Sequence, residues 1–364
     1  MNKGKHFKHL TWQDRLYLER LLKLNYSKKE IADIIGCSLA TVYNEIKRGA
    51  YEHLKSDLTT EKRYSPQKAH ITYKTFLKQK GRTPKLKADP ELRKYISDMI
   101  KGQNYSPEAV LFEIRENNLT FTEEVKSVQT IYSGIRKGVF EHLTMKDVPR
   151  HGKIKRKKQK IEKLPAYLRE QRGTSIEERP KEIEERNSFG HWEMDCVVGK
   201  LTNKKTALVL TERKTRFEVI ERLKTHTMKE VIKALNRIEK RIGAAFYKIF
   251  KSITVDNGSE FKDFRGMEKA LRRKGNRTKV YYCHPRSPNE RGTNEVTNTL
   301  VRRCKGLEKG ADFDGTLTYT TCKEAQFWVN TYPRRLFNGK CSMELFNNEL
   351  RSLKLDKLIS DLSI

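Results

Sequence analysis

Residues 189–303 alternate between strand-like and helix-like patterns, and this alternation constrains the fold more than any other feature of the sequence. A capping box at Thr227-x-x-Glu230 begins a helix that extends to about Ile242, and a later helix begins at about Asn289. Strands in a meander followed by βαβα units predict a mixed five-stranded sheet with helices on its faces. We expect the strands at residues 191–198, 206–223 (a hairpin), 253–256 and 279–283.

Two aspartates stand at conspicuous places in these strands. Asp256 directly follows a short apolar run, and ligands gather at strand ends in such sheets. Asp195 lies within the first strand, on the same face as Glu193 and Val197, because side chains alternate. Unpaired buried carboxylates are costly, so the polar pair in this strand predicts a salt bridge or a metal ion.

A third carboxylate, Glu295, comes from the later helix, with Arg291, Asn294 and Asn298 expected on nearby turns. Three carboxylates from two strands and a helix can hold two divalent ions about 3.5 to 4 Å apart, which activate the attacking oxygen and stabilise the leaving one in phosphoryl transfer. Mg²⁺ suits such an oxygen-only site, with Mn²⁺ as a substitute. Each acid alone is weak evidence, because most acidic residues are surface charges and Asp-Asn-Gly is a common turn.

The charge balance indicates the class of partner. Lys and Arg outnumber Asp and Glu by 77 to 46, and the net charge of +31 predicts binding to a polyanion, nucleic acid first. A membrane partner is not expected, since the sequence has no apolar run of transmembrane length and no signal peptide. The six cysteines are scattered without a C-x-x-C pair, so the sequence suggests neither a zinc site nor disulfides. We therefore expect a cytoplasmic protein.

Residues 26–49 have a helix-turn-helix pattern. Ser27 and Ser38 stand at N-cap positions, Gly36 permits the positive backbone angle of the turn, and Val42 is one of the apolar residues that anchor the second helix. An ordinary helical hairpin with a charged surface is the alternative. The side chains expected to line the major groove of DNA are Ala40, Asn44, Lys47 and Arg48.

This pattern is repeated further along the chain. The segment Ser38–Tyr51 recurs as Ser127–Phe140, which predicts a second DNA-reading helix and an extended DNA site. The second copy is weaker, because Gly134 inside it costs about 1 kcal/mol relative to Ala. The corresponding outward positions are Gln129, Ser133, Arg136 and Lys137.

Residues 150–186 are charged and poor in apolar side chains, as is typical of a linker or arm. Its basic run suits phosphate contacts that carry no sequence information, while a merely solvated tether is an equally good interpretation. The basic residues expected at DNA are Lys155, Arg156, Lys157 and Lys158.

Several segments in a specific order closely resemble the DDE transposases of insertion-sequence family 30. Together with the first helix-turn-helix they extend over nearly the whole chain. The matching segments are Gly190–Gly199 (GHWEMDCVVG), Ile253–Phe261 (ITVDNGSEF), Ser287–Arg303 (SPNERGTNEVTNTLVRR), Lys309–Phe313 (KGADF) and Val329–Phe346 (VNTYPRRLFNGKCSMELF).

The resemblance implies a retroviral-integrase-like RNase H fold in which Asp195, Asp256 and Glu295 bind two Mg²⁺ ions. It implies a transposase that binds the terminal inverted repeats of its own element. Water attacks at the element end and frees a 3′ hydroxyl, which then attacks target DNA. Because strand transfer needs both ends together, we expect a homodimer or higher oligomer on DNA, associated with the bacterial nucleoid.

Two departures from the family pattern bear on the third acid. The interval from Asp256 to Glu295 is longer than usual, with the extra length expected within residues 267–280. Asn289 and Glu290 replace the usual Trp-Gln, so Glu290 is the main rival as third ligand. Glu295 is preferred because it lies in RGTNE, which matches the family.

The sequence thus predicts a multidomain chain in which all-α helix-turn-helix domains precede an α/β catalytic domain. Two other functions stay open: an RNase H-like nuclease without strand transfer, and a DNA-binding repressor derived from an inactive transposase. The expected parts are a first helix-turn-helix domain (1–60), a linker and second helix-turn-helix-like domain (61–145), a basic linker (146–187), the catalytic domain (188–350) and a tail (351–364).

Overall fold

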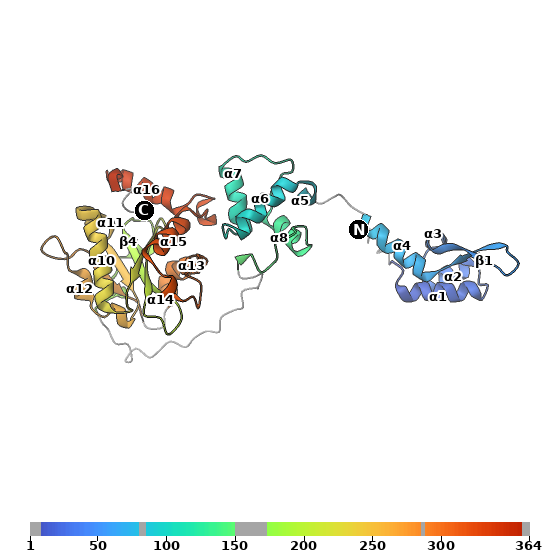
Figure 1. Cartoon of the computed structure of the whole chain (residues 1–364), viewed down its shortest axis with the longest axis horizontal. Helices are drawn as coiled ribbons and strands as arrows, with labels where there is room; N and C mark the ends of the chain where they lie inside the picture. The colour runs from blue at the N-terminus through green and yellow to red at the C-terminus, as the bar shows by residue number, and fades with distance from the viewer. Residues whose placement is uncertain (1–8, 80–84, 150–172, 285–287, 359–364) are drawn as a thin grey trace. The chain divides into compact units, whose positions relative to one another are not determined.

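The computed structural model describes residues 9–79, 85–149, 173–284 and 288–358 of the chain (Figure 1). The chain divides into two compact units, Met1–Pro84 and Lys85–Ile364. Each unit has apolar clusters of its own. Within the described ranges, no helix is both long enough and apolar enough to cross a membrane.

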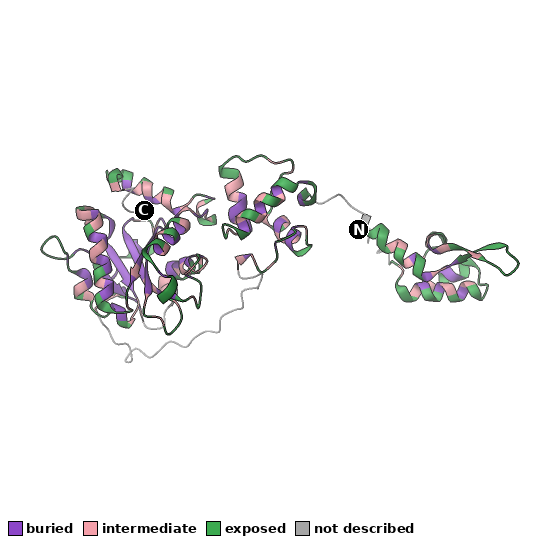
Figure 2. Ribbon diagram, viewed as in Figure 1, coloured by how far each residue is buried: buried purple, intermediate pink, exposed green. Residues whose placement is uncertain are grey.

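The first unit is a small helical domain with a two-stranded hairpin. The hairpin strands pair antiparallel and are largely exposed, whereas the helices bury a common apolar face (Figure 2). The hairpin was not among the predicted elements. The elements are α1 (Trp12–Lys23), α2 (Lys28–Ile35), α3 (Leu39–Gly49), β1 (Ala50–Leu54), β2 (Thr60–Tyr64) and α4 (Pro66–Gln79).

The predicted helix-turn-helix is formed by α2 and α3 and is confirmed in its details. The Ser27 hydroxyl accepts a hydrogen bond from the Glu30 N–H at 3.3 Å, and the Ser38 hydroxyl accepts one from the Thr41 N–H at 3.2 Å. Gly36 ends α2 with φ at +72°, a conformation that glycine adopts without strain. Val42 is buried and fixes α3 to the core.

A buried ion pair joins α1 to α3. The Arg15 Nε atom lies 2.6 Å from Oε1 of Glu45, and each side chain is 1% exposed. Arg15 also donates to the Leu10 carbonyl oxygen at 2.8 Å, and Glu45 pairs with Arg48 on the next turn of α3. Because both charges are removed from water, each depends on the other for its solvation.

We expect Glu45→Ala to destabilise the first unit by about 3 to 5 kcal/mol, since it leaves Arg15 buried without its carboxylate. Amide hydrogen exchange of the full chain, read on peptides from residues 9–79, measures this directly. Glu52→Ala, on exposed strand β1, is the matched control. Equal protection in both variants contradicts the assigned role of the pair.

The second unit begins with four helices around a separate apolar cluster. Residues 117–127 connect α7 to α8, so this connection is longer than the turn between α2 and α3. Gly134 is required by packing, because a Cβ atom there would lie 2.8 Å from Cδ1 of Leu86 and 3.0 Å from the Phe140 ring. The helices are α5 (Lys85–Ala88), α6 (Pro90–Lys101), α7 (Pro107–Glu116) and α8 (Val128–Arg136).

The rest of the second unit is built on a mixed sheet with strand order β3-β8-β7-β4-β5-β6. The strands β4, β5 and β6 form the predicted antiparallel meander, and β7 and β8 continue the sheet in parallel. The sheet has six strands rather than the five predicted, because the two-residue β3 is too short to show an alternating pattern. The strands are β3 (Thr174–Ser175), β4 (His191–Val198), β5 (Thr206–Glu212), β6 (Glu218–Leu223), β7 (Ser252–Val255) and β8 (Lys279–Tyr282).

Helices cover both faces of this sheet, as the sequence predicted. One apolar cluster includes residues of α10 (Met228–Ile242), α11 (Phe246–Ile249), α12 (Phe264–Glu268) and α16 (Ser342–Ser352). The other includes residues of α13 (Gly292–Val301), α14 (Phe313–Thr316) and α15 (Tyr319–Thr331). The remaining short helices are η3 (Ile176–Glu178), α9 (Lys181–Glu184), η4 (Gly243–Ala245), η5 (Ser259–Phe261), η6 (Pro288–Arg291), η7 (Arg335–Phe337) and η8 (Asp356–Leu358).

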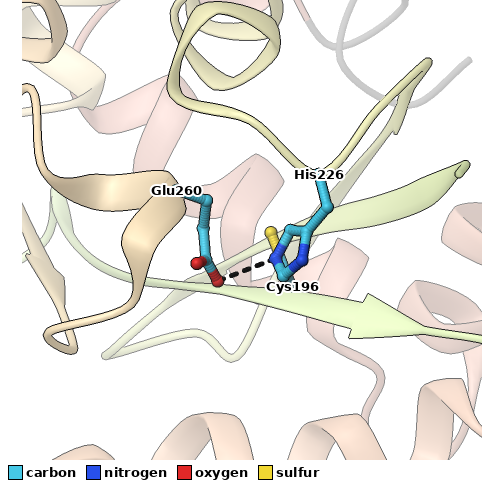
Figure 3. A group of neighbouring side chains, drawn as sticks. All are labelled: Cys196, His226 and Glu260. Carbon is cyan, nitrogen blue, oxygen red and sulfur yellow. Dashed lines mark ion pairs between the residues drawn. The ribbon is translucent and has the colours of Figure 1, made fainter. Parts of the chain in front are cut away.

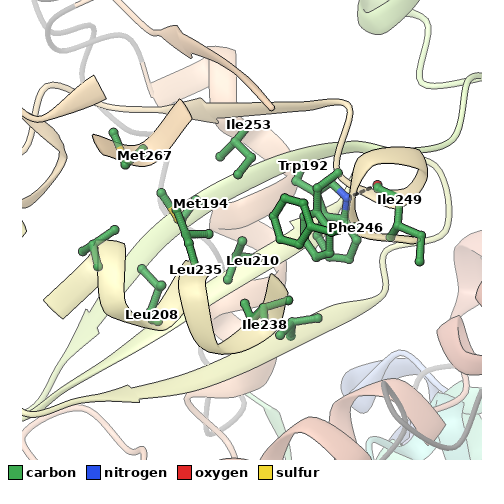
Figure 4. Packing of buried hydrophobic residues seen from close by; sticks show 14 of the residues in the cluster. Trp192, Met194, Leu208, Leu210, Leu235, Ile238, Phe246, Ile249, Ile253 and Met267 are labelled. Carbon is green, nitrogen blue, oxygen red and sulfur yellow. Dashed lines mark hydrogen bonds between the residues drawn. The ribbon is translucent and has the colours of Figure 1, made fainter. Parts of the chain in front are cut away.

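Trp192 anchors β4 in the first of these clusters (Figure 4). Its indole N–H donates to the Ile249 carbonyl oxygen at 2.7 Å, and its ring stacks on Phe250 with centroids 4.3 Å apart. The donor is satisfied in the core, so the large ring is buried without an unpaired polar atom. This packing fixes the strand that carries Asp195.

Residues 269–276, where the sequence predicted extra length, form a closed excursion between α12 and β8. Lys269 and Asn276 form an antiparallel bridge at its base. The next residue, Arg277, is fully buried, where it donates to the Met267 carbonyl oxygen at 2.7 Å and pairs with Glu239 at 3.2 Å. The bridge and the contacts of Arg277 therefore hold the two ends of this segment together.

Candidate active site

Asp195 lies on β4, and Asp256 is the residue directly after β7, the neighbouring parallel strand. The register of β4 and β7 matches Glu193 with Thr254. Two residues further along both strands, the same register brings Asp195 level with Asp256, on the same face of the sheet. The predicted approach of these two acids therefore follows from strand pairing alone.

Arg291 joins the two carboxylates. Its Nη2 atom lies 2.7 Å from Oδ2 of Asp256, and its Nη1 atom lies 3.5 Å from Oδ1 of Asp195 and donates to the Met194 carbonyl oxygen at 3.2 Å. Burial raises the pKa of Asp195, and the guanidinium charge only partly offsets this rise. Burial lowers the pKa of Arg291, but the two aspartates outweigh it and hold that pKa above its ordinary value.

The same helix supplies a second contact to Asp195. The Asn298 Nδ2 atom donates to Oδ2 of Asp195 at 2.7 Å. Arg291 is the N-cap residue of α13. Glu295 follows it by four positions and precedes Asn298 by three. Residues at these spacings share one helix face. Glu295 is exposed on this face, between the two residues that contact the aspartates.

A buried carboxylate positions α13 against the sheet. Glu193 is fully buried on β4, and its Oε1 atom lies 2.6 Å from Nη1 of Arg213, which is 1% exposed. Its other oxygen accepts from the Asn294 N–H at 3.0 Å, in the first turn of α13. The alternation in β4 predicted that Glu193 needs a partner. No sequence signal identified Arg213 as this partner, because Glu193 lies on β4 and Arg213 lies in the turn after β5.

The rival third acid, Glu290, is held elsewhere. Its Oε2 atom accepts from the His284 N–H at 2.8 Å, and its Oε1 atom lies 2.7 Å from Nδ1 of the same residue. Nε2 of His284 lies 3.0 Å from Oε1 of Glu177. Hydrogen bonding to Glu290 raises the pKa of His284. Both oxygens of Glu290 are thus engaged by one histidine rather than by the aspartates.

The four predicted DNA-reading residues of α3 divide into two kinds. Ala40, Asn44 and Lys47 are exposed on the helix surface. Arg48 is partly buried, pairs with Glu45 and lies over the Tyr73 ring with its Cζ atom 5.7 Å from the centroid. The sequence pattern gave no sign of this ion pair. Arg48 is therefore already committed to the core of the first unit.

The predicted second reader lies on α8. Gln129, Arg136 and Lys137 are exposed, and Ser133 is half-buried. The long connection between α7 and α8 differs from the tight turn of the first copy. The four basic residues predicted at DNA in the linker lie outside the described residues; they are Lys155, Arg156, Lys157 and Lys158.

Comparisons with known proteins agree with this architecture. Residues 6–49 match a protein-family model described as a helix-turn-helix domain. The chain is 30% identical over 348 residues, 93% of this chain and 94% of the relative, to a probable transposase for insertion-like sequence element IS1161 of Streptococcus salivarius. It is 29% identical over 332 residues, 90% of this chain and 92% of the relative, to the transposase for insertion sequence element IS4351 of Bacteroides fragilis.

A third relative is the transposase InsI for insertion sequence element IS30A of Escherichia coli K12, 28% identical over 307 residues, 81% of this chain and 73% of the relative. Among solved structures, the catalytic core domain of BIV integrase matches with a TM-score of 0.33 at 15% identity, over 46% of this chain and 99% of that one. A simian T-cell lymphotropic virus intasome in complex with a PP2A regulatory subunit matches with a TM-score of 0.34 at 15% identity, over 43% of this chain and 53% of that one.

The helix-turn-helix domain and these relatives define a DNA transposase, in which the helix-turn-helix domain precedes a domain built on a mixed sheet. The chain belongs to the IS30 family of transposases.

We expect the pKa of His284 to fall when Glu290 is replaced by Gln, because the carboxylate that stabilises the imidazolium is lost. In the native protein the raised pKa means that this pair contributes its full stability below the ordinary histidine pKa of about 6.5 and loses it as pH rises through the raised pKa. Histidine NMR titration of Glu290→Gln measures the change. Glu182→Gln, at an exposed position, is the control, and an unchanged His284 pKa in Glu290→Gln contradicts the assignment.

Proposed function

We propose that this transposase cleaves the ends of its own insertion sequence and joins them to target DNA, with Asp195, Asp256 and Glu295 as its metal ligands. The observation that carries this proposal is the convergence of both aspartates on Arg291. Glu295 stands between Arg291 and Asn298 on one helix face, which favours it as the third acid over Glu290.

The residues around the aspartates suit hard divalent cations, and we propose two Mg²⁺ ions, with Mn²⁺ as a substitute. Every side chain offered as a ligand is an oxygen donor, which is what these ions prefer. The amide of Asn298 adds a further oxygen: its Oδ1 atom is buried beside Asp195 and has no hydrogen-bond partner among the described residues. An unpaired buried acceptor next to a carboxylate supports a cation position there.

Ions held at this site would lower the pKa of an attacking water and stabilise charge on the leaving oxygen. Strand pairing fixes Asp195 and Asp256 relative to each other, and Asn298 orients the Asp195 carboxylate. Arg291, once displaced from the two aspartates, can bind a phosphate of the DNA strand. The 3′ hydroxyl freed by hydrolysis then attacks a phosphodiester of the target, so that cleavage and joining share one site.

DNA recognition is assigned to the parts that precede the catalytic core. We propose that α3 reads the terminal inverted repeat through Ala40, Asn44 and Lys47, with Arg48 holding the helix in place. Helix α8 adds a second contact through Gln129, Arg136 and Lys137. Joining two element ends requires at least a dimer on DNA, acting at the nucleoid in the bacterial cytoplasm.

A strand-transfer assay tests this function, using the purified protein, a labelled DNA with the terminal repeat of its element, and Mg²⁺ or Mn²⁺. Native protein gives joined products. We expect Asp195→Asn, Asp256→Asn and Glu295→Gln to lose several kcal/mol of transition-state stabilisation, about a thousandfold or more in rate.

Glu290→Gln is the matched control for Glu295→Gln and is expected to keep joining activity. Loss in Glu290→Gln with activity retained in Glu295→Gln would exchange their roles. Cleaved ends without joined products would identify a nuclease, and binding without cleavage would identify a DNA-binding relic of an inactive transposase.

We expect Arg291→Gln to bind Mn²⁺ about tenfold or more tightly in the absence of DNA, because a unit charge a few Å from the ligands opposes a cation by more than about 1.4 kcal/mol. Electron paramagnetic resonance of free Mn²⁺ measures the affinity. Arg351→Gln, exposed on α16, controls for the change in net charge. Unchanged or weaker binding by Arg291→Gln shows that the guanidinium does not compete with cations.

A further inference from the structure

Cys196, His226 and Glu260 come together in the folded chain (Figure 3). One possible ligand atom from each residue lies within 4.8 Å of the other two. Cys196 belongs to β4, His226 to the loop between β6 and α10, and Glu260 to η5. Three segments that are distant in sequence therefore present a thiol, an imidazole and a carboxylate to one point.

This cluster lies on the face of β4 opposite to Asp195. Adjacent residues of a strand point to opposite faces, and Cys196 packs against the apolar cluster on the α10 side. Val197, on the same face as Asp195, packs in the cluster on the α13 side. The Cys196 thiol is thus on the other face of β4 from Asp195, while Glu260 lies near Asp256 at the turn that carries both.

The hydrogen bonds and ion pairs of Cys196, His226 and Glu260 do not use all of their possible ligand atoms. Nε2 of His226 lies 2.9 Å from Oε1 of Glu260. The other carboxylate oxygen of Glu260 has only a long contact with the Ser259 hydroxyl, at 3.4 Å. Within the described residues the Cys196 thiol makes no hydrogen bond, so a cation would have to replace only the contact between His226 and Glu260.

The donor set selects the kind of ion. Zn²⁺ is bound in proteins by Cys sulfur, His nitrogen and Asp or Glu oxygen, and three such ligands leave a fourth position for water. Mg²⁺ and Ca²⁺ prefer oxygen ligands and match the aspartate site instead. With metal–ligand bonds of about 2.0 to 2.3 Å, tetrahedral ligand atoms lie roughly 3.3 to 3.7 Å apart. A spread of at most 4.8 Å therefore needs only side-chain adjustment, which the exposed His226 allows.

An ion here would act on the loop that carries Asp256. A Cβ atom at Gly258 would lie 2.6 Å from Oε2 of Glu260 and 2.9 Å from Oδ1 of Asp256, so both carboxylates lie close to this turn. Gly258 also donates its N–H to Asp256 at 2.9 Å. Fixing Glu260 therefore fixes the turn that orients Asp256.

We propose that Cys196, His226 and Glu260 form a zinc-class metal site that ties the turn after β7 to β4 and to the loop before α10. The site rests on its own residues and does not depend on which acids perform catalysis. Its role is positional: a bound ion holds the 256–260 turn, and binding releases the thiol proton to solvent.

Cobalt titration of the chelator-treated full chain tests the site. We expect one equivalent of Co²⁺ to bind with a thiolate-to-cobalt charge-transfer absorption, which Zn²⁺ then displaces and a large excess of Mg²⁺ does not. Cys196→Ser abolishes the absorption. His226 is exposed, so His226→Gln does not put folding at risk. We expect this variant to weaken Co²⁺ binding by more than the roughly 10- to 100-fold that is typical when a residue only supports a metal ligand.

Two variants serve as controls. Cys341→Ser changes another partly buried thiol and keeps the absorption. Asp256→Asn keeps it as well, because Asp256 is not one of the three proposed ligands. Hydrogen exchange gives an independent measurement: Zn²⁺ slows exchange in residues 256–261 of the native chain and not of Cys196→Ser. No charge-transfer band in the native chain, or a band that survives Cys196→Ser, overturns the proposal and leaves a simple His226–Glu260 ion pair.

Discussion

The contacts of the buried Glu193 carboxylate are the interactions on which the geometry of the candidate site depends. It lies in the sheet two residues before Asp195, and it binds the Arg213 guanidinium with one oxygen and the first turn of α13 with the other. A buried charge of this kind is stable only with its partners in place, so it fixes the helix to the strand. The helix residues that reach Asp195 are positioned as a consequence, because a rigid helix transmits its anchoring over two turns.

Local signals made much of this fold predictable from sequence. Caps at Ser27 and Ser38 and the positive φ of Gly36 are decided within a few residues, and so is the alternation that places Asp195 and Glu193 on one face. The hairpin β1–β2 was missed because its strands are mostly exposed, without the alternation that marks a half-buried strand. Strand β3 was missed because its two residues are too few to show a strand pattern.

Contacts between distant segments were not predictable in the same way. The pairs Arg15–Glu45 and Arg213–Glu193 and the cluster of Cys196 each join residues from different elements. Their members look like ordinary charged or isolated residues until the chain is folded. The helical spacing of Glu295 from Arg291 and Asn298 is different, because it can be counted in the sequence. Only the orientation of α13, which turns Arg291 and Asn298 toward the aspartates, had to come from the structure.

The closed excursion at residues 269–276 separates the length of chain between Asp256 and Glu295 from the distance between them in space. Arg277 and the Lys269–Asn276 bridge close its base, so residues added beyond them leave the paths of β7 and β8 unchanged. Loop length costs little free energy once the ends are held. The number of residues between Asp256 and Glu295 is therefore a poor measure of their separation in space, because residues added within this segment leave the strands that lead to the site in place.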